Sequence, residues 1–188
     1  MKKLWHTHWP LALIIGSFLL LAVSYSVINP IHEGTDELRH YRFVRYLVEN
    51  RALPVQGEEA CRSQSHHPPL IYALGALLTA GVDETADLCT TPPENPFWAY
   101  RYWDVGTDNK NMYLHPANES FPWAGDVLAA RLVRFLNIGV GALTVVLTYA
   151  TAVLIWLLHP LFAMMNLSSQ WSLLNNKIPP IIVLGHVV

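Results

Sequence analysis

The sequence predicts a mainly α-helical integral membrane protein, in which two transmembrane helices flank a large external loop that contains short helices. Apolar residues make up 52% of the 188 residues and charged residues only 14%, a low charged share for a soluble domain. Two stretches without charge are about as long as the ~20 residues that a helix needs to cross a bilayer. All fourteen Asp and Glu residues lie between these stretches.

The first transmembrane helix is expected over residues 10–28, which carry no charge. Lys2 and Lys3 lie before it, in residues 1–9. Because short positive flanks stay in the cytoplasm, this N-terminus is expected to be cytoplasmic and the following loop external. No small-x-small cleavage site ends the stretch, which favours a retained helix. A cleaved signal peptide is the alternative, because it shares the positive start and the apolar run.

The external loop is expected over residues 29–125, and it begins with a juxtamembrane helix over about 33–50. Acidic residues occupy the first turn of this helix, which suits the helix macrodipole. A second short helix is expected over about 70–82, because a Pro-Pro pair precedes an apolar segment there. At ~13 residues this segment is too short to span a bilayer. It is suited either to the membrane interface or to packing on the transmembrane helices.

The loop is acidic, and both cysteines lie in it. Between Glu33 and Asp126 the fourteen acids face seven Lys and Arg residues, a net charge of −7, and such a segment can be translocated. The whole chain has a net charge of −2 and no basic cluster, which argues against nucleic acid as a partner. In an oxidising compartment Cys61 and Cys89 could form a disulfide, and two unrelated free cysteines are the alternative.

The second apolar stretch predicts one long helix over residues 126–158, whose charge-free part, 135–158, is transmembrane. His159 and Pro160 are expected to end this helix on the cytoplasmic side. Residues 159–188 are then cytoplasmic or an incomplete third span, because neither apolar piece within them is long enough to cross. This unfinished end predicts that the chain is an N-terminal fragment of a longer protein or a frameshifted product.

An acidic patch with Asp36, Glu37 and His40 follows the first transmembrane helix directly. Ionisable groups beside a bilayer are costly to desolvate, which favours a functional interpretation. One carboxylate could take a proton from an incoming hydroxyl as a general base. The acids could also help to hold a divalent cation, the one cofactor that the sequence suggests. Simple exposure to water is the alternative.

Two further patches follow along the chain. The first is a His-Pro-Pro-Leu-x-Tyr motif that runs from His67 to Tyr72 at the start of the second short helix. The second is the pair Arg131 and Arg134 at the external end of the second transmembrane helix. These arginines could bind a lipid phosphate as bidentate donors, or could simply extend toward water at the interface.

The order of these patches resembles the N-terminal part of the GT-C class of membrane glycosyltransferases. This class includes the protein O-mannosyltransferases, the aminoarabinose transferase acting on lipid A, and many bacterial relatives. The resemblance covers about residues 10–158 and rests on Asp36–Glu37, the His-Pro-Pro-Leu-x-Tyr motif and Arg131. It implies a truncated GT-C fold in the bacterial cytoplasmic (inner) membrane, since enzymes of this class have many more spans.

The resemblance also implies a reaction. The donor is a sugar linked to a polyprenyl phosphate, and a hexose or pentose moves to an acceptor hydroxyl on the external face. Asp36 would be the catalytic base, Glu37 would support it, and Arg131 would contact the donor phosphate. The implied substrate-binding residues are completed by His40, His67 and Tyr72.

Two non-enzymatic functions fit the same composition. A small membrane protein could use its acidic external loop to bind a partner or a cation. A membrane-anchored periplasmic sensor could use the histidines, of which the chain has nine.

Overall fold

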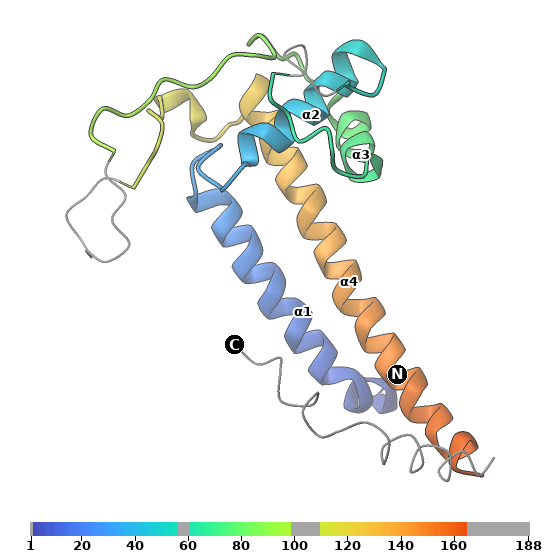
Figure 1. The fold of residues 1–188 in the computed structure, drawn as a ribbon. Coiled ribbons are helices and arrows are strands. Elements are labelled where there is room, and N and C mark those ends of the chain that lie inside the picture. Colours follow the sequence, from blue (N-terminus) through green and yellow to red (C-terminus); the bar gives the residue numbers. More distant parts are fainter. Residues whose placement is uncertain (1, 56–60, 99–109, 165–188) are drawn as a thin grey trace, which may run out of the picture. The chain divides into compact units, whose positions relative to one another are not determined.

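The structure is a computed structural model of the chain and describes residues 2–55, 61–98 and 110–164. The described elements are α1 (Lys2–Ile28), α2 (Glu37–Asn50), α3 (Leu70–Thr79), the 3-10 turn η2 (Ala117–Glu119) and α4 (Gly125–Met164) (Figure 1). No strand occurs among the described residues, which confirms the prediction of a mainly helical chain. Most of the predicted C-terminal segment, 159–188, lies outside the described residues.

The chain divides into two compact units. The larger unit, Gly16–Ala142, contains the second half of α1, all of α2 and α3, and the first part of α4. The smaller unit combines residues 1–15 with residues 143–188, and within it Nδ1 of His8 lies 2.7 Å from the Tyr149 hydroxyl. The candidate site lies wholly in the larger unit.

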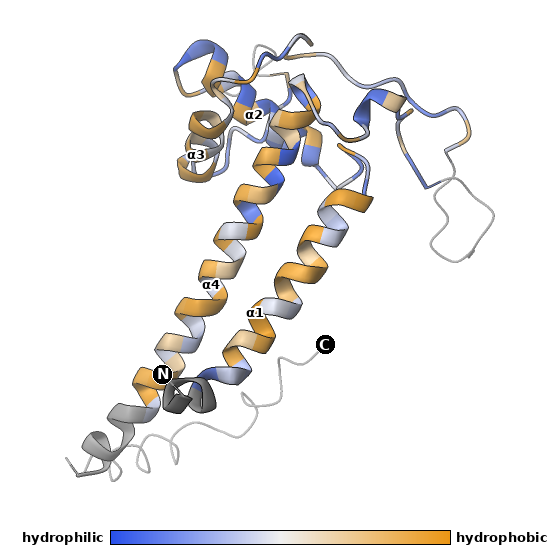
Figure 2. Ribbon diagram, turned by 180° about the vertical axis from the view of Figure 1, so that it is seen from behind, coloured by the Kyte–Doolittle hydropathy of each residue, from blue (hydrophilic) through white to orange (hydrophobic). Residues whose placement is uncertain are grey.

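Two helices are long and apolar enough to cross a membrane, over His8–Ile28 in α1 and Gly125–Trp156 in α4. Few of their residues are buried within the chain, and Figure 2 shows both helices as largely hydrophobic. The predicted end of the second helix is wrong, because α4 continues through Pro160 to Met164. A proline removes one N–H hydrogen bond and bends a helix, and the bonds of neighbouring residues can carry the helix past it.

The helix α2 begins at Glu37 rather than near residue 33. His32 and Asp36 have positive φ values of 66° and 58°, which turn the chain before the helix. Glu33 therefore lies outside α2. It accepts hydrogen bonds from the backbone N–H groups of Met112 (2.8 Å) and Tyr113 (2.9 Å) instead. The sequence predicted Glu33, Asp36 and Glu37 in the first turn, but only Glu37 stands there, with Asp36 as the N-cap residue.

The helices α2 and α3 pack closely at Gly75. A Cβ atom at this position would lie 3.1 Å from Cγ2 of Val44, so a larger residue would push the helices apart. The buried side chains between the two helices are Phe43, Val44, Tyr72 and Ala76. The contact fixes Tyr72 beside α2, and α3 ends at Thr79 rather than near residue 82.

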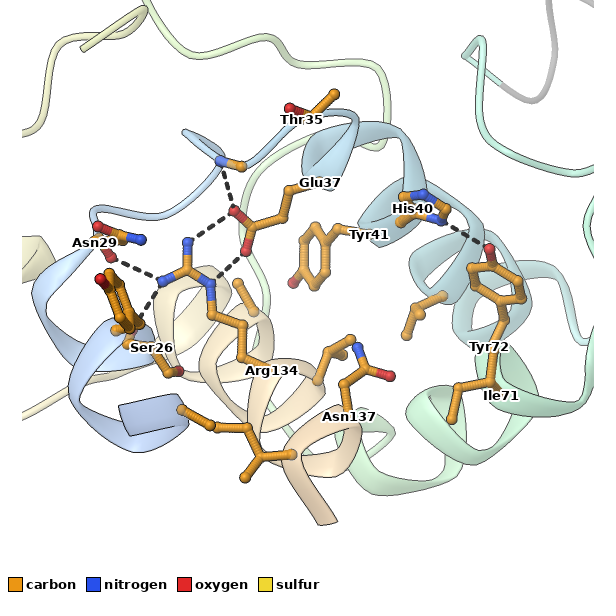
Figure 3. A pocket seen from close by; sticks show the side chains of 17 residues that line it. Ser26, Asn29, Thr35, Glu37, His40, Tyr41, Ile71, Tyr72, Arg134 and Asn137 are labelled. Carbon is orange, nitrogen blue, oxygen red and sulfur yellow. Dashed lines mark hydrogen bonds and ion pairs between the residues drawn. The ribbon is translucent and has the colours of Figure 1, made fainter. Parts of the chain in front are cut away.

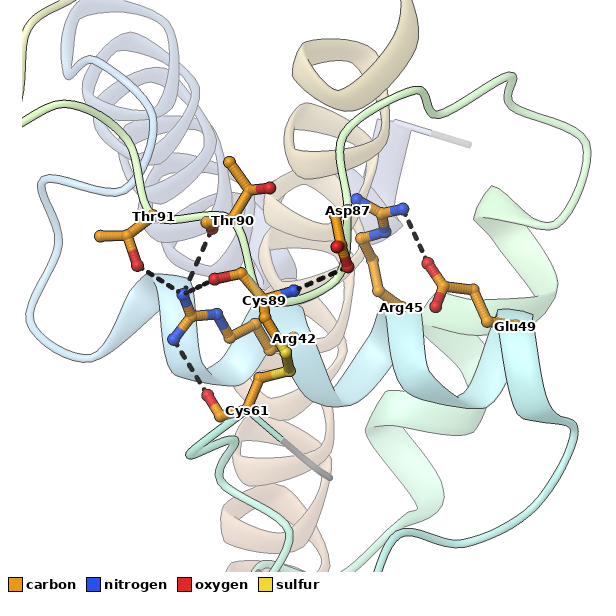
Figure 4. Close-up of a disulfide and its surroundings, with 8 residues drawn as sticks. All are labelled: Arg42, Arg45, Glu49, Cys61, Asp87, Cys89, Thr90 and Thr91. Carbon is orange, nitrogen blue, oxygen red and sulfur yellow. Dashed lines mark hydrogen bonds and ion pairs between the residues drawn. A yellow bond between two sulfur atoms is a disulfide. The ribbon is translucent and has the colours of Figure 1, made fainter. Parts of the chain in front are cut away.

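Cys61 and Cys89 form a disulfide whose Cα atoms lie 5.1 Å apart, a separation typical of this bond (Figure 4). Arg42 of α2 donates hydrogen bonds to the carbonyl oxygens of Cys61 (3.0 Å) and Cys89 (3.2 Å). It donates further bonds to the Thr90 carbonyl and the Thr91 hydroxyl. The disulfide joins the two loop segments, and Arg42 holds both of them on α2.

Candidate functional site

A cavity of about 580 Å³ lies where the ends of α1 and α4 meet the starts of α2 and α3 (Figure 3). Its volume is within the range of small-ligand sites. Much of its apolar lining comes from α1 and α4, through Ala22, Ala130, Val133 and Ile138. Its polar groups include Glu37 and His40 of α2, Tyr72 of α3, and Arg134 and Asn137 of α4. The lining therefore suits a ligand with an apolar and a polar part.

Arg134 and Glu37 form an ion pair in this lining. The guanidinium donates from Nε to one carboxylate oxygen and from Nη2 to the other, the second at 2.7 Å. It also donates to the carbonyl oxygens of Ser26 (2.8 Å), Asn29 (2.8 Å) and Pro30 (2.7 Å). These contacts occupy all the N–H donors of a guanidinium. Arg134 thus caps the free carbonyls at the end of α1 and joins them to α2.

Glu37 is ionised in this environment. Burial alone would raise the pKa of its carboxyl, but the hydrogen bond and charge of Arg134 outweigh burial and bring the pKa below its usual 4.5. An ionised carboxylate accepts hydrogen bonds only. A general base works best when its pKa lies near the working pH, so Glu37 is better suited to holding Arg134 than to taking a proton.

His40 and Tyr72 form a second polar pair in the lining. Nδ1 of His40 lies 2.7 Å from the Tyr72 hydroxyl, and the ring centroids are 5.9 Å apart. Burial, and after it repulsion by His67, lowers the pKa of His40, so its imidazole is neutral at pH 7. Burial raises the pKa of Tyr72, whose hydroxyl keeps its proton. A neutral imidazole can accept a proton from a bound hydroxyl, the task that the sequence predicted for Asp36.

Asp36 and His67 lie outside the cavity lining, although both are predicted site residues. The Asp36 side chain is 44% exposed and pairs with Arg39 at 3.5 Å. His67 is exposed too, and its ring centroid lies 5.3 Å from that of His40. Asp36 faces water because it precedes the first helical residue, whereas the side chain of Glu37 is directed at Arg134.

Arg131 is also outside the lining and is only 3% exposed. Its Nη1 donates to the carbonyl oxygens of Ser26 and Asn29, and Cζ lies 5.3 Å from the Trp123 ring centroid. The sequence predicted Arg131 as the contact for a donor phosphate. Its burial against the end of α1 leaves Arg134, one turn further along α4, as the arginine that lines the cavity. The (i, i+3) spacing of the two arginines was the signal for this second residue.

A separate polar cluster, which the sequence analysis did not predict, connects η2 to the turn before α2. Nε2 of His115 lies 2.7 Å from Glu33, and Nδ1 lies 2.9 Å from Glu119. The two ring nitrogens point to different carboxylates, so the imidazole bridges them. The described residues contain no group of three His, Cys, Asp or Glu side chains placed to hold a metal ion.

Comparisons of the chain with protein-family models, with curated proteins and with solved structures found no match. The chemistry of the cavity and the order of motifs along the chain are therefore the observations that point to a function.

Proposed function

We propose that this chain forms one wall of a membrane glycosyltransferase site, which moves a sugar from a polyprenyl-phosphate-linked donor to an acceptor hydroxyl. The observation that carries the proposal is the mixed lining of the cavity at the ends of two membrane-length helices. A lipid-linked sugar phosphate has the same two-part character. Its polyprenyl chain suits the apolar side chains of α1 and α4, and its head group suits His40, Tyr72 and Arg134.

In this proposal α1 and α4 cross the bacterial cytoplasmic membrane, and the segment between them is external. The lysines before α1 and the net charge of −7 between Glu33 and Asp126 support this orientation. The cavity then lies where the helices leave the bilayer on the external side. A membrane-bound donor presents its phosphate and sugar at the same depth, at the external surface of the bilayer.

The transfer forms a bond from the acceptor oxygen to the anomeric carbon and breaks the bond from that carbon to the donor phosphate. The phosphate leaves with the electron pair, and the acceptor hydroxyl gives its proton to a base. The resemblance to the GT-C class proposes Asp36 as this base, and the cavity lining favours His40. Arg134 would stabilise the leaving phosphate by exchanging Glu37 for it.

A non-enzymatic protein with an acidic binding loop has less support. The carboxylates of Glu33 and Glu119 pair with His115, and Glu84 and Asp126 pair with Arg45. Carboxylates that are already paired within the chain offer little to an external cation or basic partner.

Binding of decaprenyl phosphate to the purified chain tests the proposal by native mass spectrometry. A retained complex is expected, weakened by Ala22→Phe, which fills the cavity. The matched control Ala12→Phe, on the same helix but outside the lining, should leave binding unchanged. Decaprenol, which lacks the phosphate, should bind less. Equal binding by both variants, or equal binding of alcohol and phosphate, would contradict the proposal.

A transfer assay with a labelled polyprenyl-phosphate sugar separates the two candidate bases. Loss of a general base costs about 10²-fold or more in rate. Asp36→Asn and His40→Gln should therefore differ strongly in transfer rate, because only one of them removes the base. Transfer by Asp36→Asn at the wild-type rate would remove Asp36 from the mechanism. Loss of transfer in Asp36→Asn with unchanged donor binding would restore it as the base.

A further inference from the structure

Asn137 is a polar residue in the charge-free part of α4, residues 135–158, and in the membrane-length segment Gly125–Trp156. A polar side chain inside a membrane-spanning segment is costly to desolvate, and such residues commonly have a partner or a function. In membrane helices the usual partner is a polar group on a neighbouring helix. The first question is therefore what the amide of Asn137 meets.

The side chain of Asn137 belongs to the cavity lining and has no partner there. Figure 3 shows it directed into the cavity, between Arg134 and Ile71. Its amide makes no hydrogen bond to any other residue that the structure describes. Its two N–H donors and its carbonyl acceptor are thus free for a ligand.

Asn137 lies deeper in the cavity than Arg134. It follows Arg134 by three residues, so both side chains project from the same side of α4. A helix rises about 1.5 Å per residue, which puts Asn137 about 4.5 Å further into the bilayer in the proposed orientation. Ala22 and Ile138, which also line the cavity, are apolar. Asn137 therefore places a polar group between the level of Arg134 and the lining that suits a polyprenyl chain.

A phosphate in this cavity needs more donors than Arg134 can release. Arg134 donates to three carbonyl oxygens at the end of α1 and to both carboxylate oxygens of Glu37. The bonds to Glu37 are those that can be exchanged without uncapping α1. Phosphate oxygens that face the hydrocarbon find no water to bond. A neutral amide can serve these oxygens without the cost of burying a second charge.

We propose that the side-chain amide of Asn137 donates a hydrogen bond to a phosphate oxygen of the lipid-linked donor, from the bilayer side and opposite Arg134. Asn137 is thereby a specificity-determining residue that favours a lipid phosphate over a lipid alcohol. The phosphate gains negative charge as its bond to the anomeric carbon breaks, so the same hydrogen bond stabilises the leaving group. The inference rests on the proposed function and deepens it by assigning a role to Asn137.

Native mass spectrometry of the full chain tests this contact with decaprenyl phosphate and decaprenol as ligands. Asn137→Asp keeps the shape of the side chain but sets a carboxylate against the phosphate, and Asn137→Leu removes the donors. A hydrogen bond to a charged group is worth about tenfold or more in affinity. We expect both variants to lose about tenfold or more in affinity for decaprenyl phosphate, with the larger loss in Asn137→Asp. Both should bind decaprenol as the wild-type chain does, which shows that the cavity is intact.

The matched control is Asn50→Asp, which makes the same chemical change at an exposed position of α2 outside the lining. It should leave the binding of decaprenyl phosphate unchanged. An equal loss in this control would attribute the effect to the net charge of the chain and overturn the contact. An equal loss of decaprenol binding in both Asn137 variants would also overturn it, because Asn137 would then only shape the cavity.

The wild-type chain separates the two proposals. If it binds decaprenyl phosphate no better than decaprenol, the proposed function itself fails. If it prefers decaprenyl phosphate and both Asn137 variants keep that preference, the role of Asn137 is wrong and the proposed function stands.

Discussion

Adjacent acidic residues in this chain have different environments, and the local backbone is the cause. Asp36 has a left-handed φ of 58° and stands before the first turn of α2, with its side chain 44% exposed. Glu37 is the first helical residue, and its side chain is 21% exposed against Arg134. In the sequence Asp36 and Glu37 look like a single acidic motif. In the fold Asp36 forms an ion pair at the surface, whereas Glu37 forms a half-buried ion pair with Arg134.

Glu37→Gln is expected to destabilise the chain by about 1–3 kcal/mol, because it removes the charge that Arg134 contacts through two hydrogen bonds. The control is Asp36→Asn, which breaks an exposed pair with Arg39 and should cost at most about 0.5 kcal/mol. Guanidinium unfolding followed by tryptophan fluorescence measures both. A similar loss in the free energy of unfolding for the two variants would show that the ion pair of Glu37 with Arg134 stabilises the fold no more than a surface ion pair does.

His32 should make stability depend on pH. Burial lowers its pKa from 6.5 to about 4, so between these values the unfolded chain binds a proton that the folded chain refuses. Stability is therefore full above pH 6.5 and falls as the pH drops toward 4, by up to about 3 kcal/mol. His32→Asn tolerates the φ of 66° and should remove most of this loss. The unfolding midpoint is measured at pH 7 and pH 4.5 for the wild-type chain and for His32→Asn. An equal loss of stability in the two proteins would contradict the role of His32.

At the scale of elements, α2 organises the segment between α1 and α4. Arg42 holds the two disulfide-linked loops, and Arg45 pairs with Glu84 (3.0 Å) and Asp126 (3.1 Å). The side chain of Glu84 is 7% exposed, and burial raises its pKa. A buried charge requires partners, so these arginines specify which loops lie on α2. The cavity depends on this arrangement, because α2 supplies Glu37 and His40.

The contact between α2 and α3 should be sensitive to an added side chain at Gly75. In Gly75→Val the new Cβ would meet Val44, and overpacking of this kind costs about 1–3 kcal/mol. The same substitution at Gly81, where an added Cβ atom would meet no non-neighbouring residue within 4 Å, is the matched control and should be far milder. Thermal unfolding compares the two variants, and because Tyr72 would shift with α3, lipid-phosphate binding should also weaken in Gly75→Val alone. Equal melting temperatures would show that the two helices separate without cost.

At the scale of the whole molecule, the sequence predicts those features that depend on the summed hydropathy of neighbouring residues. Membrane-length helices are visible because hydropathy accumulates over a continuous window, and the ends of α1 and α4 shift without changing that sum. The cavity was only partly predictable. Glu37 joins Arg134 across 97 residues and His115 joins Glu33 across 82, and no periodicity connects positions that far apart. The resemblance favoured Arg131 as the phosphate contact, whereas the fold places Arg134 in the cavity lining.

We expect the N-terminus to be cytoplasmic and the segment between α1 and α4 to be external, and two independent measurements must agree on this orientation. Ser120 is exposed between η2 and α4, so Ser120→Cys should react with a membrane-impermeant maleimide in intact cells. A cysteine added before Met1 should react only after lysis, because the positive flank of α1 stays inside. The same external placement would expose Cys61 and Cys89 to an oxidising compartment, in which their disulfide would persist. Alkylation of these two cysteines should therefore require prior reduction.

Labelling of Ser120→Cys only after lysis would reverse the orientation and put the disulfide in a reducing compartment. External labelling combined with free thiols would instead contradict the disulfide and leave the orientation intact.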